Sequence, residues 1–229
     1  RHLLRPVNNT VGRPITGTEV KFLKEDGDLA SAGETGVIYV RGPQVMKGYF
    51  KRDDDTSAVL SSDGWLNTGD LGTATLTGEI QITGRAKDTI VLLSGENVEP
   101  EPIENFVRQS DFIDHVMIVG QDQRFLGALV VLNLETVSTQ VSNQGGECKN
   151  LLEAAQNTIV IELIKNEINS RINPKNGFKN FERISQIMLL DEEFLVGRQL
   201  THTMKMRRHI IESQYKKRID NLFKRGDYN

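Results

Sequence analysis

An acidic side chain at the end of a turn-rich stretch is the first candidate for chemistry. Residues 63–70 contain Gly64, Asn67 and Gly69 and end in Asp70. A carboxylate held beside glycine in a loop can accept hydrogen bonds from two hydroxyls, which is what a ribose diol offers. An Asx-type turn explains the same residues without any ligand, and the stretch by itself favours that simpler interpretation.

Two basic segments are further candidates. Residues 83–88 place Arg85 and Lys87 in a short charged segment that is also typical of plain protein surface. Residues 200–205 place two threonine hydroxyls and the ammonium of Lys205 just before a basic helix. A lysine in such a loop can hold an anionic centre as a compact point charge, although most exposed lysines have no such role.

Other common catalytic patterns are missing from the sequence. The four histidines are scattered, and no cluster of His, Cys or carboxylate residues has the spacing of metal ligands, so we expect no metal site. Neither Gly-x-Ser-x-Gly nor Gly-x-x-x-x-Gly-Lys-Ser/Thr occurs, so a serine hydrolase and a P-loop of that type are both unsupported. The single Cys148 excludes an internal disulfide framework and fits a reducing compartment, which leads us to expect a cytoplasmic protein.

The first part of the chain is expected to supply short strands and turns around Asp70. Fifteen of the 20 glycines lie between Gly12 and Gly127. The spacing predicts a short helix from about Asp53, whose carboxylate we expect to cap it. Stretches suited to β-strands are bounded by Gly, Asp, Asn and Ser, and they cover residues 19–23, 37–41 and 79–83.

After Arg85 the pattern changes to alternating strands and helices, and we place a domain boundary near Lys87. Pro100 and the acidic residues after it suit the first turn of a helix, because the first amides of a helix lack internal partners. The remaining patterns predict strands over residues 89–93, 115–119, 128–132 and 184–190, and helices over residues 151–172 and 206–223.

Length and composition set the limits within which these segments act. The chain has 229 residues, 38% of them hydrophobic, and its 28 Lys and Arg against 31 Asp and Glu give a formal charge of −3. This is enough for one or two soluble domains, and no apolar run approaches the roughly 18 residues of a membrane-spanning helix. The chain begins at Arg1 without an initiator Met, so we expect a piece of a longer protein.

Charge is divided unevenly along the chain. From Arg198 onward nine basic residues stand against three acidic ones, so this tail carries +6 and the rest of the chain −9. A basic end on an acidic chain could meet phosphate, an acidic lipid surface or the chain's own acidic face. A solvated helix face is the simpler explanation, and the tail lacks the interleaved aromatic residues of a nucleic-acid site.

Taken in order, these segments resemble the adenylate-forming enzymes, which include acyl-CoA synthetases, firefly-type luciferases and peptide-synthetase adenylation domains. Residues 33–50 are similar to the family's Gly-Glu segment, and residues 65–70 to its Trp-x-x-Thr-Gly-Asp motif. Residues 84–104 are similar to its hinge motif, and residues 201–208 to its C-terminal lysine motif. Four ordered motifs across nearly the whole chain make a chance match very unlikely.

The resemblance implies an α+β fold with a division at the hinge motif. Residues 1–86 would be the β-rich last subdomain of the large N-terminal adenylating domain, and residues 87–229 its small, mobile α/β C-terminal domain. The length of the stretch between Leu132 and Leu200 is similar to that of the long-chain fatty acid branch. His202 departs from the proline that is usual in the lysine motif, which implies a less rigid loop.

The resemblance also implies a reaction and a role for each motif residue. The family uses ATP with Mg²⁺ to convert a carboxylic acid, here a fatty acid, to acyl-AMP and then transfers the acyl group to the thiol of CoA. Asp70 and Arg85 would bind the ribose of ATP, and Lys205 would bridge the acid and the α-phosphate. Lys87 would be the hinge, and Gly95 would line the path of the pantetheine arm.

The family's phosphate loop normally lies upstream of these motifs, so the expected partner is the missing upstream part of the same chain. We therefore expect that this chain alone neither binds ATP tightly nor turns over. The alternatives are an acyl-AMP ligase or acyl-carrier-protein synthetase of the same family, and a non-catalytic interaction domain. We expect no nucleic-acid partner, and the basic tail leaves peripheral contact with an anionic membrane open.

Overall fold

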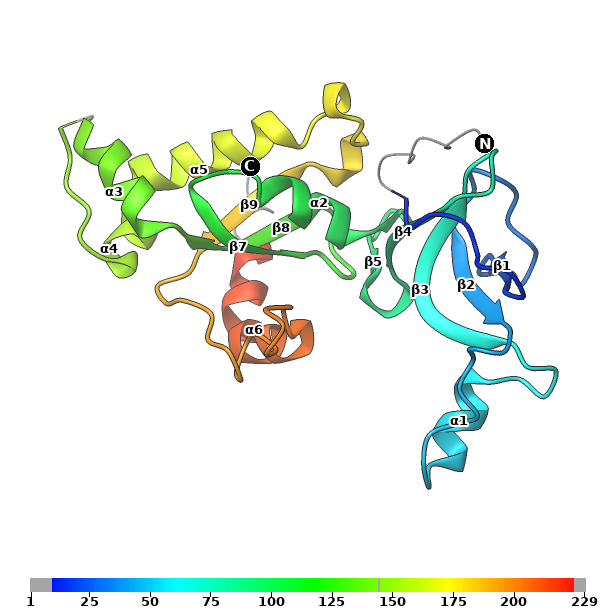
Figure 1. The fold of residues 1–229 in the computed structure, drawn as a ribbon. Coiled ribbons are helices and arrows are strands. Elements are labelled where there is room, and N and C mark those ends of the chain that lie inside the picture. The colour runs from blue at the N-terminus through cyan, green and yellow to red at the C-terminus, as the bar shows by residue number, and fades with distance from the viewer. Residues whose placement is uncertain (1–9, 144, 225–229) are drawn as a thin grey trace, which may run out of the picture. The chain divides into compact units, whose positions relative to one another are not determined.

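A computed structural model describes residues 10–143 and 145–224 of the chain. The chain divides between Thr89 and Ile90 into two compact units, which are described separately below. Strands and helices occur in both units, which confirms the predicted α+β class (Figure 1). The division lies three residues beyond the expected boundary after residue 86.

The first unit is built on a four-stranded antiparallel sheet in the order β1-β2-β3-β4 (Figure 1). Three of these strands coincide closely with those expected from the sequence, whereas β3 was read there as a turn-rich stretch. The elements of this unit are β1 (Glu19–Leu23), β2 (Gly36–Arg41), α1 (Asp53–Val59), β3 (Leu66–Ala74), β4 (Ile80–Arg85) and the short 3-10 helix η1 (Ala86–Asp88).

The expected capping role of Asp53 is wrong. Helix α1 begins at Asp53 itself, and the residue in the cap position is Arg52, whose side chain makes no capping hydrogen bond. The Arg52 carbonyl accepts the first helical hydrogen bond from the Thr56 amide at 3.0 Å, and the Thr56 hydroxyl adds a second at 2.8 Å. Asp53 therefore lies in the first turn, where its charge favours the positive end of the helix.

The sheet of the first unit buries very little apolar surface. Among its described residues only two hydrophobic side chains are buried, Phe22 and Ile38. A sheet normally packs one face against another layer, because a single sheet cannot shield its own apolar side chains from water. Large hydrophobic side chains remain exposed on this unit, including Ile15, Leu76 and Ile82. By this measure the first unit has no complete core of its own.

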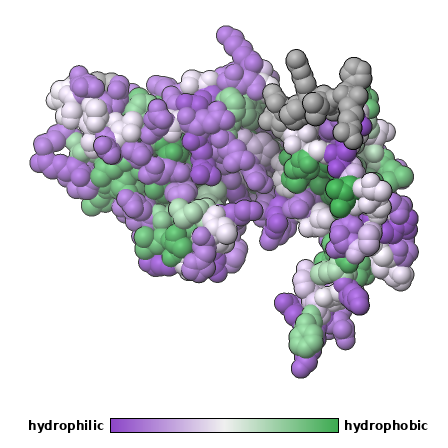
Figure 2. Space-filling model, viewed as in Figure 1, coloured by the Kyte–Doolittle hydropathy of each residue, from purple (hydrophilic) through white to green (hydrophobic). Residues whose placement is uncertain are grey.

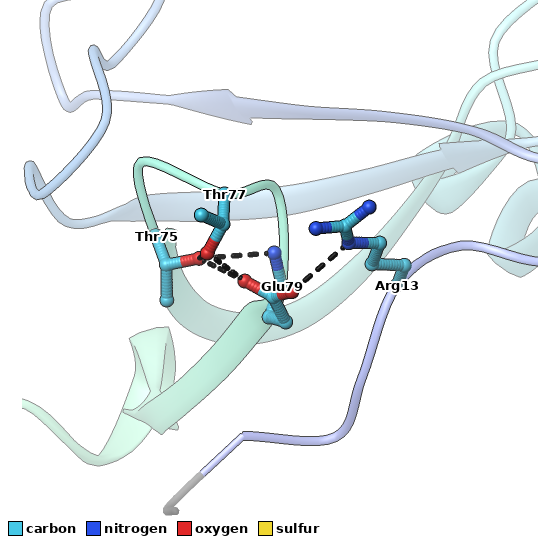
Figure 3. Close-up of polar contacts among 4 residues, drawn as sticks. All are labelled: Arg13, Thr75, Thr77 and Glu79. Carbon is cyan, nitrogen blue, oxygen red and sulfur yellow. Dashed lines mark hydrogen bonds and ion pairs between the residues drawn. The ribbon is translucent and has the colours of Figure 1, made fainter. Parts of the chain in front are cut away.

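Polar contacts stabilise the turn between β3 and β4 (Figure 3). The carboxylate of Glu79 accepts hydrogen bonds from the hydroxyls of Thr75, at 2.5 Å, and Thr77, and it pairs with Arg13 at 2.9 Å. These hydroxyl donors, aided by Arg13, lower the pKa of Glu79 to about 2, because they favour the charged form. The nearly buried carboxylate thus ties the segment around Arg13 to the hairpin.

The second unit contains a three-stranded sheet in the order β7-β8-β9 and a small hairpin of β5 and β6. Strand β8 runs antiparallel to β7 and parallel to β9. The elements are β5 (Ile90–Val91), β6 (Asn97–Val98), α2 (Pro100–Val107), β7 (Ile113–Val119), β8 (Leu126–Leu132), α3 (Leu134–Asn143), α4 (Leu151–Gln156), α5 (Thr158–Arg171), the 3-10 helices η2 (Pro174–Asn176) and η3 (Asn180–Glu182), β9 (Ile184–Leu189) and α6 (Arg208–Lys224).

Strand β8 is buried along its whole length because both faces of the sheet are covered. Successive side chains of a strand point to opposite faces, so β8 contributes to two cores. Its even-numbered residues pack with α2, α3, α4 and α5, whereas Leu129 and Val131 pack with Ile211, Tyr215 and Phe223 of α6. Figure 1 shows α6 on the side of the sheet opposite α2 and α5.

Gly127 allows α6 to approach the sheet closely. A Cβ atom at this position would lie 2.9 Å from Leu222 Cδ2 and 3.2 Å from the ring of Phe223. These distances are shorter than ordinary contacts between carbon atoms. Because Gly127 has no side chain, α6 can pack this close to β8.

Most of the elements expected in this unit are present, with several differences. The strand expected over residues 89–93 is reduced to Ile90–Val91, and the strand β6 was not expected. The helix expected over residues 151–172 is two helices, because Asn157 interrupts it and caps α5 by accepting a hydrogen bond from Ile159 at 2.9 Å. Helix α3 was not anticipated from the sequence. Within the described ranges, none of the helices has the length and apolar character required to cross a membrane.

The unequal cores predict unequal local stability. We expect amides in β7 and β8 to exchange with solvent at least tenfold more slowly than those in β2 and β3, because few buried apolar side chains oppose local opening of the first sheet. Amide hydrogen exchange followed by NMR on the 229-residue chain measures both sheets in one sample. Equal protection of the two sheets would contradict this expectation.

The hydrogen bonds and the ion pair of Glu79 predict that the stability of the first unit falls at low pH. In the folded chain the pKa of Glu79 is lowered to about 2 from an ordinary value near 4.5. Its contribution to the free energy of unfolding is therefore complete above pH 4.5 and is lost as the pH falls toward 2. Trp65, the single tryptophan, reports on this unit by fluorescence. Glu79→Gln should lower the stability of the first unit at pH 7 and remove much of its loss between pH 4.5 and 2. An unchanged acid transition in the variant would contradict this role.

Candidate functional site

Asp70 and Arg85 are brought together by the pairing of β3 with β4. The two residues are direct partners in the antiparallel register, and Arg85 Nε lies 3.1 Å from Asp70 Oδ1. The Asp70 side chain is 29% exposed and that of Arg85 is 51% exposed. An ion pair this open to water adds little to the stability of the fold, and its polar atoms remain accessible to a ligand.

The residues before Asp70 explain how its backbone is fixed. Gly69 has a φ of 72°, a conformation that glycine adopts without strain, and its amide donates to Asn67 Oδ1 at 2.9 Å. Thr68 donates its hydroxyl to the Ile38 carbonyl and accepts from the Asp70 amide at 3.1 Å. Asx-type bonding therefore does occur here. Asp70 itself lies within strand β3 and not in a loop, which corrects the expectation from the sequence.

Lys87 and Gly95 occupy different kinds of local structure. Lys87 is exposed in the 3-10 helix η1, directly after β4. Gly95 lies in the turn between β5 and β6 with a φ of 90°, and its amide donates to the Leu92 carbonyl at 2.8 Å. The turn itself requires glycine at this position, since L-residues rarely adopt such a φ. A side chain there would meet no atom within 4 Å.

Lys205 lies on a short hairpin that precedes α6. The hairpin is closed by the Thr201 amide, which donates to the Lys205 carbonyl at 2.8 Å, and by the Lys205 amide, which donates to Thr201 Oγ1 at 3.1 Å. Met204 has a φ of 62°, which is unfavourable for a residue with a long side chain and costs on the order of 1–3 kcal/mol. The Lys205 side chain is exposed at the end of this strained turn.

The base of this hairpin is braced by buried polar groups. The Arg207 amide donates to the Gln199 carbonyl at 2.8 Å. Gln199 is nearly fully buried, and its side chain bonds the Leu195 amide and Gln214 of α6. Gln214 and Tyr215 in turn donate to Glu192. The loop that carries Lys205 therefore rests on α6 through several hydrogen bonds and not through apolar contact alone.

A buried ion pair joins the hinge motif to the lysine motif, and no role was assigned to it from the sequence. Glu104 of α2 contacts Arg208, the first residue of α6, with a distance of 2.5 Å between Oε1 and Nη1. Burial raises the pKa of Glu104, and Arg208 opposes that rise. The signal was present in the sequence, because Glu104 shares the buried helix face of Ile103 and Val107. Removal of one member of such a pair typically costs about 3–5 kcal/mol.

The described residues do not gather a metal site. No group of three or more His, Cys, Asp or Glu side chains in residues 10–143 and 145–224 could hold a metal ion.

Comparison with known proteins identifies the class that this fold and these motifs define. The family model of the AMP-binding enzyme C-terminal domain matches residues 87–227, and the model of the AMP-binding enzyme itself matches residues 3–50. The chain belongs to the AMP-binding, adenylate-forming enzyme family and corresponds to its C-terminal part.

The more similar relatives are named as acyl-activating enzymes and long-chain acyl ligases. The chain is 37% identical to the probable acyl-activating enzyme 16, chloroplastic, of Arabidopsis thaliana, over 98% of this chain and 32% of the relative. It is 36% identical to the long-chain-fatty-acid--[acyl-carrier-protein] ligase AEE15, chloroplastic, of the same plant, over 95% and 29%. It is 34% identical to human long-chain-fatty-acid--CoA ligase 1, over 93% and 31%. The chain thus spans about a third of the length of the curated relatives it matches.

Solved structures show the same fold. The adenylation domain of a carboxylic acid reductase from Segniliparus rugosus, in complex with AMP and a co-purified carboxylic acid, has a TM-score of 0.77 at 20% identity, covering 93% of this chain and 32% of that domain. This likeness supports the α+β assignment and the correspondence to adenylating enzymes at the level of fold.

Proposed function

We propose that this chain is the C-terminal part of an AMP-forming long-chain fatty acid–CoA ligase. Residues 1–86 would be the last, β-rich part of the large adenylating domain. Residues 87–229 would be the small mobile domain that follows it. The observation that carries the proposal is Lys205, exposed at the end of a strained and braced hairpin. Strained backbone that the surroundings hold in place is common at functional sites, and the hydrogen bonds of Gln199 and Thr201 hold this hairpin.

The proposed reaction has two steps. A carboxylate oxygen of the fatty acid attacks the α-phosphorus of ATP, so an acyl-AMP bond forms and pyrophosphate leaves. The thiol sulfur of CoA then attacks the acyl carbonyl, loses its proton, and releases AMP. Both steps bring negative groups together, so positioning and neutralisation of charge supply most of the catalysis.

The motif residues divide this work. The Asp70 carboxylate would accept hydrogen bonds from the two ribose hydroxyls, and Arg85, its partner across the strands, would orient that carboxylate and contact the same sugar. The ammonium of Lys205 would neutralise charge between the fatty acid carboxylate and the α-phosphate during the first step. These roles use side chains that the structure leaves accessible.

The second step requires a different position of the small domain. Lys87 lies in a one-turn element near the end of the first unit, just before the division between Thr89 and Ile90, which is the kind of place where a chain absorbs a change in φ and ψ. After rotation, the turn at Gly95 would line the path of the pantetheine arm. The space around Gly95 is open, since a Cβ atom at this position would have no neighbouring atom within 4 Å, and this fits close approach by a thin substrate.

The proposal includes an upstream partner within the same protein. The first unit buries only Phe22 and Ile38 among its described hydrophobic residues, and the relatives are about three times longer than this chain. Further sequence would cover this sheet and supply the ATP phosphate loop. We accordingly expect the 229-residue chain by itself neither to bind ATP tightly nor to turn over. We propose a cytoplasmic enzyme, and the basic tail leaves peripheral contact with an anionic membrane open.

A second acceptor is favoured by one specific observation. The relative AEE15 is named as an acyl-carrier-protein ligase, and its identity to this chain, 36%, is as high as that of the CoA ligases. Transfer to the thiol of a carrier protein uses the same acyl-AMP and the same residues. Product analysis of the complete enzyme with CoA and with carrier protein separates the two acceptors.

Lys205 provides the first test of this proposal. In the complete enzyme, Lys205→Ala should lower the rate of acyl-AMP formation by about 10²–10³-fold, the effect of removing one preorganised charge from the reacting centre. Thioester formation from supplied acyl-AMP should change less than threefold. Lys216→Ala, on the exposed face of α6, is the matched control and should leave both rates intact. Equal loss in both half-reactions would refute the role of Lys205.

The hinge assignment makes a separate prediction. Lys87→Pro fixes φ near −65° and should slow thioester formation at least tenfold, because the small domain must rotate for that step, while acyl-AMP formation changes less than threefold. Lys87→Ala removes the side chain but leaves the backbone free, so it should retain both activities. Single-turnover assays of each half-reaction measure this. Thioester formation at the wild-type rate in Lys87→Pro would show that Lys87 is not the hinge.

A further inference from the structure

The hairpin that carries Lys205 connects directly to a deeply buried ion pair of the second unit, Glu104 with Arg208. Only Met206 and Arg207 separate Lys205 from Arg208, which begins α6. The position of the first turn of α6 therefore constrains the backbone at Lys205 through only two intervening residues.

Both ends of the Arg208 guanidinium are held. Its Nη1 donates to Glu104 Oε1 at 2.5 Å, and its Nη2 donates to the carbonyl of Ile118 in β7, also at 2.5 Å. The Ile118 amide donates to the same Glu104 oxygen at 2.8 Å. These three hydrogen bonds form a closed link between α2, β7 and the start of α6, which we call the Glu104 link.

The Glu104 link is shielded from water. The side chains of Glu104 and Arg208 are 7% and 14% exposed. Other ion pairs of this unit are more open, as in the case of Arg218 and Asp191, whose side chains are 41% and 40% exposed. Two charges withdrawn from water are costly to keep unless their geometry is well satisfied. A planar guanidinium with two donors satisfies two acceptors at a fixed angle, which an ammonium cannot do.

We propose that Glu104 is a positioning residue for catalysis: it holds Arg208 in a fixed orientation and so fixes the hairpin that presents Lys205. This inference rests on the proposed function of Lys205. A purely structural role would stabilise the sheet and the hairpin alike, whereas a positioning role acts on the hairpin. The Glu104 link would set the orientation of the lysine hairpin relative to β7 and α2.

Two conservative substitutions test the proposal in the 229-residue chain. Glu104→Gln keeps an acceptor for the Ile118 amide but removes the charge. Arg208→Lys keeps the charge beside Glu104 but loses the two-donor geometry. In both variants we expect the amides of Thr201 and Arg207, which close the hairpin and its base, to exchange at least tenfold faster. In Arg208→Lys, which keeps the charge pair, amides of β7 and β8 should change less than threefold, whereas loss of the charge in Glu104→Gln also lowers the stability of the whole unit.

Asp191→Asn is the matched control. It removes an ion pair to another arginine of α6, and it should leave the exchange of the Thr201 and Arg207 amides unchanged. Hairpin exchange that stays at the wild-type rate in Glu104→Gln and Arg208→Lys would overturn the proposal. Equal acceleration in the hairpin and in the sheet of Arg208→Lys would also overturn it, since that result would make the two-donor geometry a stabiliser of the whole unit.

Kinetics of the complete enzyme separate this inference from the function on which it rests. Glu104→Gln should lower kcat for acyl-AMP formation about tenfold with less than a twofold change in KM for ATP, and Asp191→Asn should change neither. If Lys205→Ala leaves acyl-AMP formation intact, the proposed function fails whatever the hairpin does. If Lys205→Ala abolishes it and Glu104→Gln does not lower kcat, the positioning role alone fails.

Discussion

The buried contact between Glu104 and Arg208 is the constraint on which the placement of the lysine hairpin depends. It joins residues 104 positions apart in the sequence and brings the hinge motif and the lysine motif to the same strand, β7. Apolar packing on both faces of β8 forms the unit, but apolar contacts are not directional. The charged guanidinium of Arg208, which donates two hydrogen bonds, adds the direction that the proposed role of Lys205 needs. The two motifs are therefore parts of one structural arrangement.

The first unit achieves its geometry in another way. Here the antiparallel register of β3 and β4 places Asp70 opposite Arg85, and backbone hydrogen bonding with Gly69 in a positive φ fixes the carboxylate. The sheet holds this position although only two of its described hydrophobic side chains are buried. Figure 2 shows hydrophobic residues at the surface of the chain, and Ile15, Leu76 and Ile82 of this unit are among the exposed ones. Such a surface fits a sheet that packs against more protein in a longer enzyme.

Local pattern was sufficient for strands with runs of β-suited apolar residues and for the last helix. Strands β1, β2, β7, β8 and β9 and helix α6 were all predicted close to their observed bounds. Strand β3 was missed because Asn67 and Gly69 are typical of turns, and only pairing with β2 and β4 makes them a strand. The break at Asn157 and the buried charge of Glu104 depend on tertiary neighbours. The roles of Asp70, Arg85, Lys87, Gly95 and Lys205 came from family resemblance and stay proposals.

The central claim is that one chain supplies both the ribose-binding pair and the lysine of an acid-activating site. A crystal structure of the complete enzyme with a non-hydrolysable acyl-adenylate analogue tests it most directly. We expect the Asp70 carboxylate within hydrogen-bond distance, roughly 2.5–3.0 Å, of both ribose hydroxyls, and Lys205 Nζ at a similar distance from the group that replaces the α-phosphate. A ribose held by other residues, with Asp70 and Lys205 both remote from the analogue, would contradict the account.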